Sequence, residues 1–563
     1  MAREILTLQL GNYANYVGTH WWNIQEASFN YDPNADPSEI DHDVLYREGK
    51  TLTRQTTYTP RLLLLDLKGT LKFMPEEGEL YGGGGGHNSA QDVAGEEEVA
   101  KEIGWEASKV EVIKKEPAVK CEYQRDLQQI ADEEDEEEKD YNFKETVEDW
   151  VDFSYSRFHP RSINMVNEYS HSKEENLFDT ITNGMELWQN YDFQDDATDR
   201  IRQYVEECDG CQGFQTLFDC VDGFAGIGAK CLEHLQDEYG KAGLAFPLIP
   251  PKMLNFKNAD EIMSGSVRIV NTALCFSNLV ESCSLFVPLS TMGRCWRALD
   301  QPRTFPHVSY EESNLYHTSA LLATFLDTVS LRYRMKNPAT GNYLPSLCTD
   351  VTPYGRKMGA AGLAMPFGLN NTEDLIDFLD QNEQKLHTQL TPNVAVGTKY
   401  LFQSVAVRGI PRSKLKRPPT AKSAQRQQRM AAYRCDSVSE MLQFYYQCQL
   451  HASMSHVTAC SAPMDLRTPF PNEILQTRVG YDGFLGEFDL GVKQKVISTP
   501  TLATIQSSGD LSDTLESLHR EVSRIKIEKI PRFAESGLEQ EEYKESLERL
   551  LNFKELYEDN YEL

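Results

Sequence analysis

Long apolar runs are missing from this chain of 563 residues. No uninterrupted apolar segment approaches the roughly 18 residues that a membrane-spanning helix needs, and no secretory segment is expected near the first residues. No lipidation signal is found either, so any membrane association is expected to be peripheral. The 12 cysteines are few for this length, which argues against a disulfide scaffold and favours a reducing cytosolic or nuclear setting.

The motifs of several enzyme classes are also missing. The chain has no G-x-S-x-G, no H-E-x-x-H and no Walker loop, so we expect no hydrolase triad, no zinc protease site and no P-loop. Positive charge is scarce, because 56 Lys and Arg residues oppose 86 Asp and Glu residues and leave a net charge of -30. This negative field repels phosphate backbones, so nucleic acid is not expected as a partner.

Apolar residues make up 40% of the chain, enough for two or three packed units, but they become sparse between residues 75 and 145. This stretch contains five consecutive glycines, Gly82 to Gly86, and the acidic run ADEEDEEEKD at 131–140. Such compositions bury too little apolar surface to offset the entropy of the chain. We predict that 75–145 is a mostly mobile insertion with one ordered patch around Trp105.

Two segments show a buried strand that leads through a small-residue loop into a helix. In the first, the run Ile5 to Leu10 is followed by Gly11 and a helical stretch. In the second, GFQTLFDC at 213–220 precedes a turn over Asp222 to Gly228 and a helix over Ala229 to Tyr239. In a parallel sheet such loops lie at the carboxyl ends of the strands, where free N–H groups favour an anion. The pattern predicts the outline of a nucleotide site.

Further elements are indicated by apolar periodicity. RLLLLDLKGTLKFM at 61–74 predicts a strand that ends in Asp66 and is apolar on both faces, as in a sheet covered by helices. A helix is expected from Asp195 to Cys208, and Ser512 or Asp513 is expected to cap another. Two C-terminal helices are expected, each with an apolar stripe. The stripe of the first consists of Leu515, Leu518, Val522 and Ile525, and that of the second consists of Tyr543, Leu547, Leu550 and Leu551.

The loops resemble those of tubulins. GNYANYVG, from Gly11 to Gly18, stands where tubulins have G-Q-C-G-N-Q-I-G, and CDGCQGFQ at 208–215 is similar to their C-D-x-L-Q-G-F-Q. The stretch from Tyr316 to Arg334 resembles the tubulin core helix. With YANYVGTHWWN after the first strand and HPRSI at 159–163, the chain is identified as a member of the misato branch of the tubulin/FtsZ-like proteins.

The resemblance implies an α/β fold of the tubulin type. It consists of a Rossmann-type, mostly parallel sheet in the N-terminal domain, a central core helix, an α+β second domain and C-terminal helices. The expected boundaries are 1–313 for the first domain with its insertion at about 75–145, 314–334 for the core helix, 335–508 for the second domain and 509–563 for a helical hairpin.

The resemblance also implies which residues would bind a nucleotide. The matching positions are Gly11, Asn12, Tyr13, Asp66, Gly223, Ala225 and Gly226. Side chains replace several glycines that a phosphate loop needs, at Val221, Asp222, Phe224 and Ile227. Lys68 replaces an acidic residue that helps to hold magnesium. We therefore expect degenerate loops without a resident metal or cofactor, and weak binding of GTP or GDP is left open.

Two other positions of the tubulin pattern are altered. After Arg334 only Asp350 is available for the residue that activates water for a neighbouring subunit's nucleotide. Leu315 aligns with an asparagine that contacts guanine, and Asn314 is one residue away. We therefore expect no GTPase activity and no catalytic residue.

The family resemblance implies a non-enzymatic protein involved in mitochondrial distribution and morphology and in spindle assembly and microtubule organisation. Such a protein acts by binding other proteins, and tubulin and the cytosolic chaperonin are the candidate partners. The implied location is the cytoplasm, with peripheral association to the mitochondrial outer membrane. The alternative is a GTP-binding, self-assembling GTPase like tubulin or FtsZ.

Two surface hypotheses concern aromatic and basic residues. Tyr13, Tyr16, Trp21 and Trp22 would either stack on a base or a partner, or fill the core. The basic block at 412–429 would either bind acidic tubulin tails or an anionic membrane, or form a solvated loop.

The cysteines allow one more hypothesis. Cys208-x-x-Cys211 and Cys231-x-x-His234 together have the spacing of a zinc site. Against this, Cys208 stands where tubulins have a buried cysteine without metal, so a structural thiol is the other interpretation.

Overall fold

The computed structural model describes residues 3–30, 37–50, 54, 56–75, 119–130, 139–171, 177–251, 258–296, 301–336, 342–382, 386–395, 400–417, 427, 429–449, 453–489 and 491–558. Most of the predicted insertion, including the patch around Trp105, and the centre of the basic block lie outside these residues. The described end of the insertion contains α3 (Glu122–Ile130) and the start of α4 (Phe143–Thr146).

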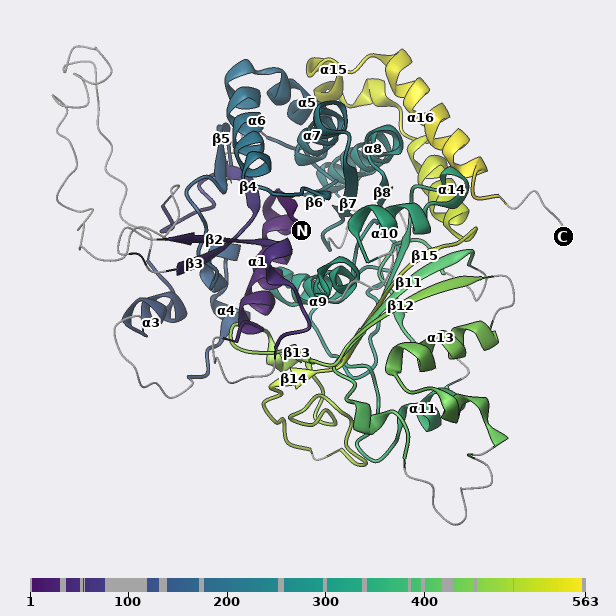
Figure 1. Ribbon diagram of the computed structural model, residues 1–563. Coiled ribbons are helices and arrows are strands. Elements are labelled where there is room, and N and C mark those ends of the chain that lie inside the picture. Colours follow the sequence, from purple (N-terminus) through teal and green to yellow (C-terminus); the bar gives the residue numbers. More distant parts are fainter. Residues whose placement is uncertain are drawn as a thin grey trace.

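A six-stranded sheet is the framework of the first half of the chain (Figure 1). All neighbouring strands in it are parallel. Their order is β5 (Ile163–Ser170), β4 (Leu62–Lys68), β1 (Ile5–Leu10), β6 (Gly213–Asp219), β7 (Ala242–Leu248) and β8 (Leu285–Phe286). Every residue of β1 and β6 is buried, because helices cover both faces. The three predicted strands and the predicted α/β class are confirmed.

Alternate residues of the strands face two separate halves of the core. Leu6, Leu8 and Leu10 pack on the side of α5 (Ile181–Gln189), α6 (Tyr191–Glu206), α7 (Phe224–Tyr239) and α8 (Ala259–Ser282). Ile5 packs on the other side, with α1 (Asn12–Ala27) and α9 (Leu315–Arg334). The period of two along each strand therefore builds a core above and below the same sheet.

Helix α7 begins at Phe224, so the predicted start at Ala229 is wrong. The Phe224 N–H donates to Asp222 Oδ1 over 3.0 Å, which starts the helix within the stretch predicted as a turn. Small residues occur here because α5 packs directly on the helix. A Cβ on Gly226 would lie 2.0 Å from the Ile181 carbonyl oxygen. The small-residue pattern thus indicates close helix packing.

Helix α9 separates the six-stranded sheet from a second, mixed sheet (Figure 1). Every residue from Tyr316 to Arg334 is buried, which is typical of a helix packed on all sides. The second sheet has the order β10 (Thr388–Gln389), β9 (Ala360–Ala364), β15 (Thr501–Ser507), β11 (Phe402–Arg408) and β12 (Met454–Cys460). Only the β11–β12 pair is parallel within the described sheet. The division of the chain into domains stays a prediction.

The C-terminal helices α14 (Leu511–Val522) and α16 (Gln540–Glu555) pack on the six-stranded half, against α8. The stripe from Leu515 to Ile525 is buried as predicted, whereas Leu551 of the second stripe is 37% exposed. The expected cap at Ser512 or Asp513 is wrong. The N–H of Ser512 already bonds to the Gly509 carbonyl, so Asp510 precedes the first helical residue.

The remaining described elements are short. They are β2 (Tyr46–Lys50), β3 (Thr56–Pro60), η3 (Trp150–Phe153), α10 (Leu344–Val351), α11 (Leu375–Gln381), α13 (Val438–Gln449), β13 (Met464–Asp465), β14 (Ser498–Thr499) and α15 (Pro531–Glu535). None of the described helices combines the length and the apolarity that crossing a membrane requires.

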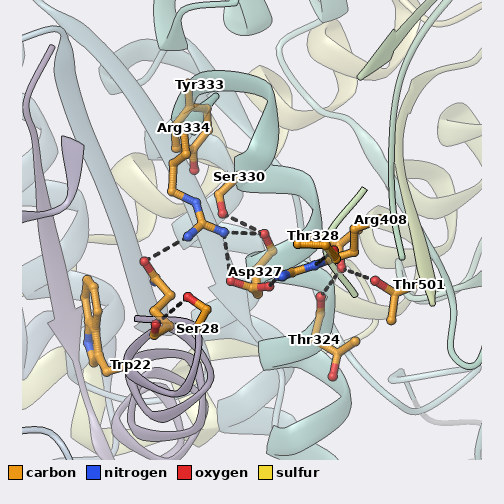
Figure 2. A network of polar contacts seen from close by, with 12 residues as sticks. Trp22, Ser28, Thr324, Asp327, Thr328, Ser330, Tyr333, Arg334, Arg408 and Thr501 are labelled. Atoms are coloured by element: carbon orange, nitrogen blue, oxygen red, sulfur yellow. Dashed lines mark hydrogen bonds and ion pairs between the residues drawn. The ribbon is translucent and has the colours of Figure 1, made fainter. Parts of the chain in front are cut away.

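A buried charge network joins α9 to β11 of the second sheet and to α1 (Figure 2). Asp327 lies between the guanidinium groups of Arg334 on α9 and Arg408 on β11. Arg334 Nη1 also donates to Gln25 Oε1 of α1 over 3.0 Å, and Arg408 Nη2 donates to the Pro463 carbonyl over 2.7 Å. Burial alone would raise the pKa of Asp327, but the two guanidinium groups hold it below its ordinary value.

We expect Asp327→Ala to lower the free energy of unfolding by about 3–5 kcal/mol, because two buried guanidinium groups lose their counter-charge. The matched control is Glu233→Ala, which breaks an exposed pair with Lys230 and should change stability by less than about 0.5 kcal/mol. Urea titration followed by circular dichroism measures both variants. Equal losses would contradict the assigned role of the network.

Candidate functional site

The order of the strands points to one edge of the six-stranded sheet. After β1 the chain adds β4 and β5 on one side of β1, and it then returns to add β6, β7 and β8 on the other side. The direction in which strands are added to the sheet therefore reverses between β1 and β6. In open α/β sheets ligands bind in the crevice outside the carboxyl ends of the strands at such a reversal. The loops predicted from the sequence, at Gly11, Asp66 and Gly223, follow β1, β4 and β6 and meet at this edge.

The carboxyl group of Asp219, the last residue of β6, lies at this edge. It accepts hydrogen bonds from the backbone N–H groups of Tyr13 and Ala14, over 2.9 and 3.0 Å. These are unpaired donors of the first turn of α1, the position at which a helix otherwise binds an external anion. The chain therefore supplies its own acidic group where a phosphate would bind.

Gly11 allows this close approach. Its φ of +107° lies in the region that side chains rarely adopt, and a Cβ there would be 2.7 Å from Asp219 Oδ2. Burial raises the pKa of Asp219 well above its ordinary value, and repulsion from Asp222 adds to this. The bonds from α1 act in the opposite direction.

Asp66, near the end of β4, is also a buried carboxyl group that accepts hydrogen bonds from within the protein. Its Oδ2 accepts from Asn15 Nδ2 and from Trp150 Nε1, both over 2.9 Å, and its Oδ1 accepts from the Leu67 N–H over 2.8 Å. Burial raises the pKa of Asp66, and these hydrogen bonds oppose the shift. Lys68, two residues later, is exposed.

The short helix η3 lies next to Asp66, to which its Trp150 donates. Lys72 binds this segment through Glu148 at 2.9 Å and through Asp149 and Asp152 at 3.1 Å. Trp150 and Phe153 of η3 are fully buried. The loop after β4 is thus bonded to the chain that follows the insertion.

The third loop, after β6, is also paired within the protein. The Gly223 N–H donates to the Phe178 carbonyl over 3.1 Å, and Gly223 has no room for a side chain because a Cβ would lie 2.6 Å from the Phe178 ring. Ala225 is fully buried in α7. Removal from water raises the pKa of Asp222 to about 7, against the hydrogen bond from Phe224. The assignment of this loop to a nucleotide stays a prediction.

The aromatic residues of α1 are part of the core. Tyr13, Tyr16, Trp21 and Trp22 are at most 3% exposed, which confirms the core interpretation. The Tyr16 hydroxyl donates to the Glu148 carbonyl over 2.7 Å, so this side chain also ties α1 to the segment before η3. Asn12 lies in the first turn of the same helix, and its Oδ1 is buried without a hydrogen bond.

Other predicted positions have local partners. Asn314 caps α9 and accepts from the N–H groups of Tyr316 and His317 over 2.9 and 3.3 Å. Asp350 forms an ion pair with Arg332 at 2.6 Å. Among the described residues, neither side chain is part of an assembled hydrolytic site.

The sequence interpretation missed Asp219, Trp150 and Phe178. The first carried a signal, because an acidic residue ends an otherwise buried strand. The other two come from segments far from β1 in sequence, and no local pattern indicated that they would reach the crevice.

The residues of the zinc hypothesis do not form an assembled metal site among the described residues. Cys231 is buried in α7, and His234 lies 6.3 Å from the Trp188 ring. Among the residues that the structure describes, no group of three or more His, Cys, Asp and Glu side chains is placed to hold a metal ion.

Comparison with known proteins relates the chain to a single family. Residues 3–129 match the Misato Segment II tubulin-like domain, and residues 141–335 match a Tubulin domain. The chain is 44% identical to Protein misato of Drosophila melanogaster over 99% of both chains. It is 33% identical to Protein misato homolog 1 of Homo sapiens over 99% of this chain and 98% of the relative.

The first prediction concerns the contact of Gly11 with Asp219. Gly11→Ala should lose about 1–3 kcal/mol more stability than Gly69→Ala, because it also displaces the Asp219 carboxyl group from the N–H groups of α1. Gly69 is a matched control, since its φ of +103° is similar but nothing lies within 4 Å of the added Cβ. Urea midpoints measure the difference, and equal losses would contradict the contact.

The second prediction concerns pH. The pKa of Asp222 is about 7 in the folded chain and 3.8 ordinarily, so folding favours the protonated form, and this stabilisation is lost progressively as the pH rises from 3.8 to about 7. Asp222→Asn cannot ionise, so its stability relative to the unchanged chain should increase from pH 5 to pH 8, by about 3 kcal/mol. Urea midpoints at both pH values test this. A constant difference would show that Asp222 does not titrate in this range.

Proposed function

Since the chain belongs to the misato family of tubulin-like proteins, we propose that it acts by binding protein partners and that it does not hydrolyse GTP. The observation that supports this proposal most directly is the position of Asp219. Its carboxyl group takes the N–H groups of α1 that a nucleotide phosphate would need.

The electrostatics of the crevice support the same proposal. Burial raises the pKa values of Asp219 and Asp222, Asp66 raises both further, and Asp222 adds to the shift of Asp219. A triphosphate would bring further negative charge to these carboxyl groups and would have to displace Asp219. A site of this kind disfavours nucleotide binding, so the function is assigned to the surface of the protein.

The proposed role is in mitochondrial distribution and morphology and in spindle and microtubule organisation. The proposed partners are tubulin and the cytosolic chaperonin, and the proposed location is the cytoplasm with peripheral contact to the mitochondrial outer membrane. A tubulin-like fold without an open nucleotide site is suited to a role in which tubulin-like surfaces are recognised and no nucleotide-driven assembly is required.

One surface is suited to protein binding. The segment from β13 to β14 exposes four large apolar side chains, Tyr481, Phe488, Val492 and Ile497. Lys414, from the described end of the basic block, lies 4.9 Å from the Phe484 ring of the same segment. Exposed aromatic and aliphatic side chains that gather on one segment are typical of protein interfaces.

The first arm of the experiment measures nucleotide. The full-length protein is purified gently and denatured, and released guanine and adenine nucleotides are quantified by chromatography, with GTP and magnesium titrated by calorimetry as a check. We expect far less than one nucleotide per chain and no binding heat. Near-stoichiometric GDP or GTP would overturn the proposal and favour the self-assembling GTPase.

The second arm measures binding of the same preparation to purified tubulin and to purified chaperonin. Phe488→Ala should weaken the complex at least about tenfold, because it removes an exposed aromatic anchor. Tyr191→Ala is the matched control, since Tyr191 is equally exposed but lies at the start of α6, toward the other end of the molecule (Figure 1). Absence of both complexes would overturn the proposed partners.

A further inference from the structure

A pair of cysteines lies at the opposite edge of the six-stranded sheet from the crevice. Cys208 and Cys211 form a C-D-G-C turn between α6, which ends at Glu206, and β6, which begins at Gly213. Both thiols are partly exposed. Neither takes part in the site described above, which lies at the carboxyl end of β6.

The turn holds both cysteines in a defined position. The Cys208 thiol donates to the Tyr204 carbonyl over 3.2 Å, and the Cys211 thiol donates to the Gly213 carbonyl over 3.7 Å. The carboxylate of Glu4, which is 3% exposed, accepts from the N–H groups of Asp209 and Gly210 over 3.2 and 3.0 Å. A buried carboxylate that bonds both central residues gives the turn one conformation, and each thiol shifts the pKa of the other.

The surroundings differentiate the two thiols. The neighbouring Cys208 side chain lowers the pKa of Cys211 to about 7, and Lys241 acts in the same direction, while burial opposes both. The Cys211 side chain and burial raise the pKa of Cys208. By contrast, burial raises the pKa of the enclosed cysteines Cys220, Cys231 and Cys275.

We propose that Cys208 and Cys211 are a reversible redox site, which a small-molecule disulfide of the glutathione type oxidises to an intramolecular disulfide. The Cys211 thiolate attacks one sulfur of the oxidant, forms a mixed disulfide and releases one thiolate. The Cys208 thiol then loses its proton to that thiolate and attacks Cys211, which releases the second thiolate, and this takes a proton from solvent. One disulfide is reduced to two thiols while the protein loses two hydrogens.

The main experiment uses the full-length protein in buffers of reduced and oxidised glutathione, followed by thiol blocking, digestion and mass spectrometry. Cys220 lies in the same tryptic peptide, because no Lys or Arg occurs between Arg202 and Lys230, so fragmentation must locate the bond. We expect a Cys208–Cys211 disulfide that dithiothreitol reverses. Cys208→Ser should retain glutathione on Cys211, and Cys211→Ser should retain much less on Cys208.

The control is Cys448, an exposed cysteine on α13. Cys448→Ser should leave the Cys208–Cys211 disulfide unchanged. In the unchanged chain Cys448 should form only mixed disulfides. This comparison separates a paired site from general thiol oxidation.

A measurement on the unchanged chain does not depend on the folding of any variant. The rate of alkylation of Cys211 is followed against pH and should show a midpoint near 7. Three results would overturn the proposal: no intramolecular disulfide at any glutathione ratio, a Cys211 midpoint at or above about 8.5, the ordinary value of a cysteine thiol, or stoichiometric zinc that protects both thiols from oxidation.

Discussion

The carboxylate of Asp327 lies away from water between two guanidinium groups, and the two halves of the fold are arranged around this charge. A buried ion is strongly destabilising when it is left alone, so α1, α9 and β11 must stay where Gln25, Arg334 and Arg408 meet. The network therefore fixes the position of α9 against α1 on one side and against β11 on the other.

Buried polar groups also need partners at the carboxyl end of the six-stranded sheet, and there the protein supplies them itself. The first turn of α1 leaves donors that need an acceptor, and Asp219 provides one from the end of β6. Asp66 obtains its donors from Asn15 and from Trp150. The fold thus keeps the geometry of an anion site and satisfies it internally.

Much of this fold was accessible from the sequence. Runs such as Ile5 to Leu10 and the buried stripe of α14 have a local period, and burial follows from that period. The start of α7 was predicted wrongly for a physical reason. Small residues near Gly226 are compatible both with a loop and with a closely packed helix. The neighbouring helix α5 decides between the two, and it is too far from Gly226 in the sequence for a local pattern to reveal it.

The sequence by itself determined the α/β class, the strands of the first sheet, the buried core helix and the loss of glycines from the phosphate loops, because each depends on the pattern of nearby residues. Tertiary structure alone decided what occupies the crevice. Asp219 and Tyr13 are 206 residues apart, and Asp66 and Trp150 are 84 residues apart. Hydrogen bonds between residues so far apart in the sequence produce no periodic sequence pattern. They form only when the sheet and its helices place the partners side by side.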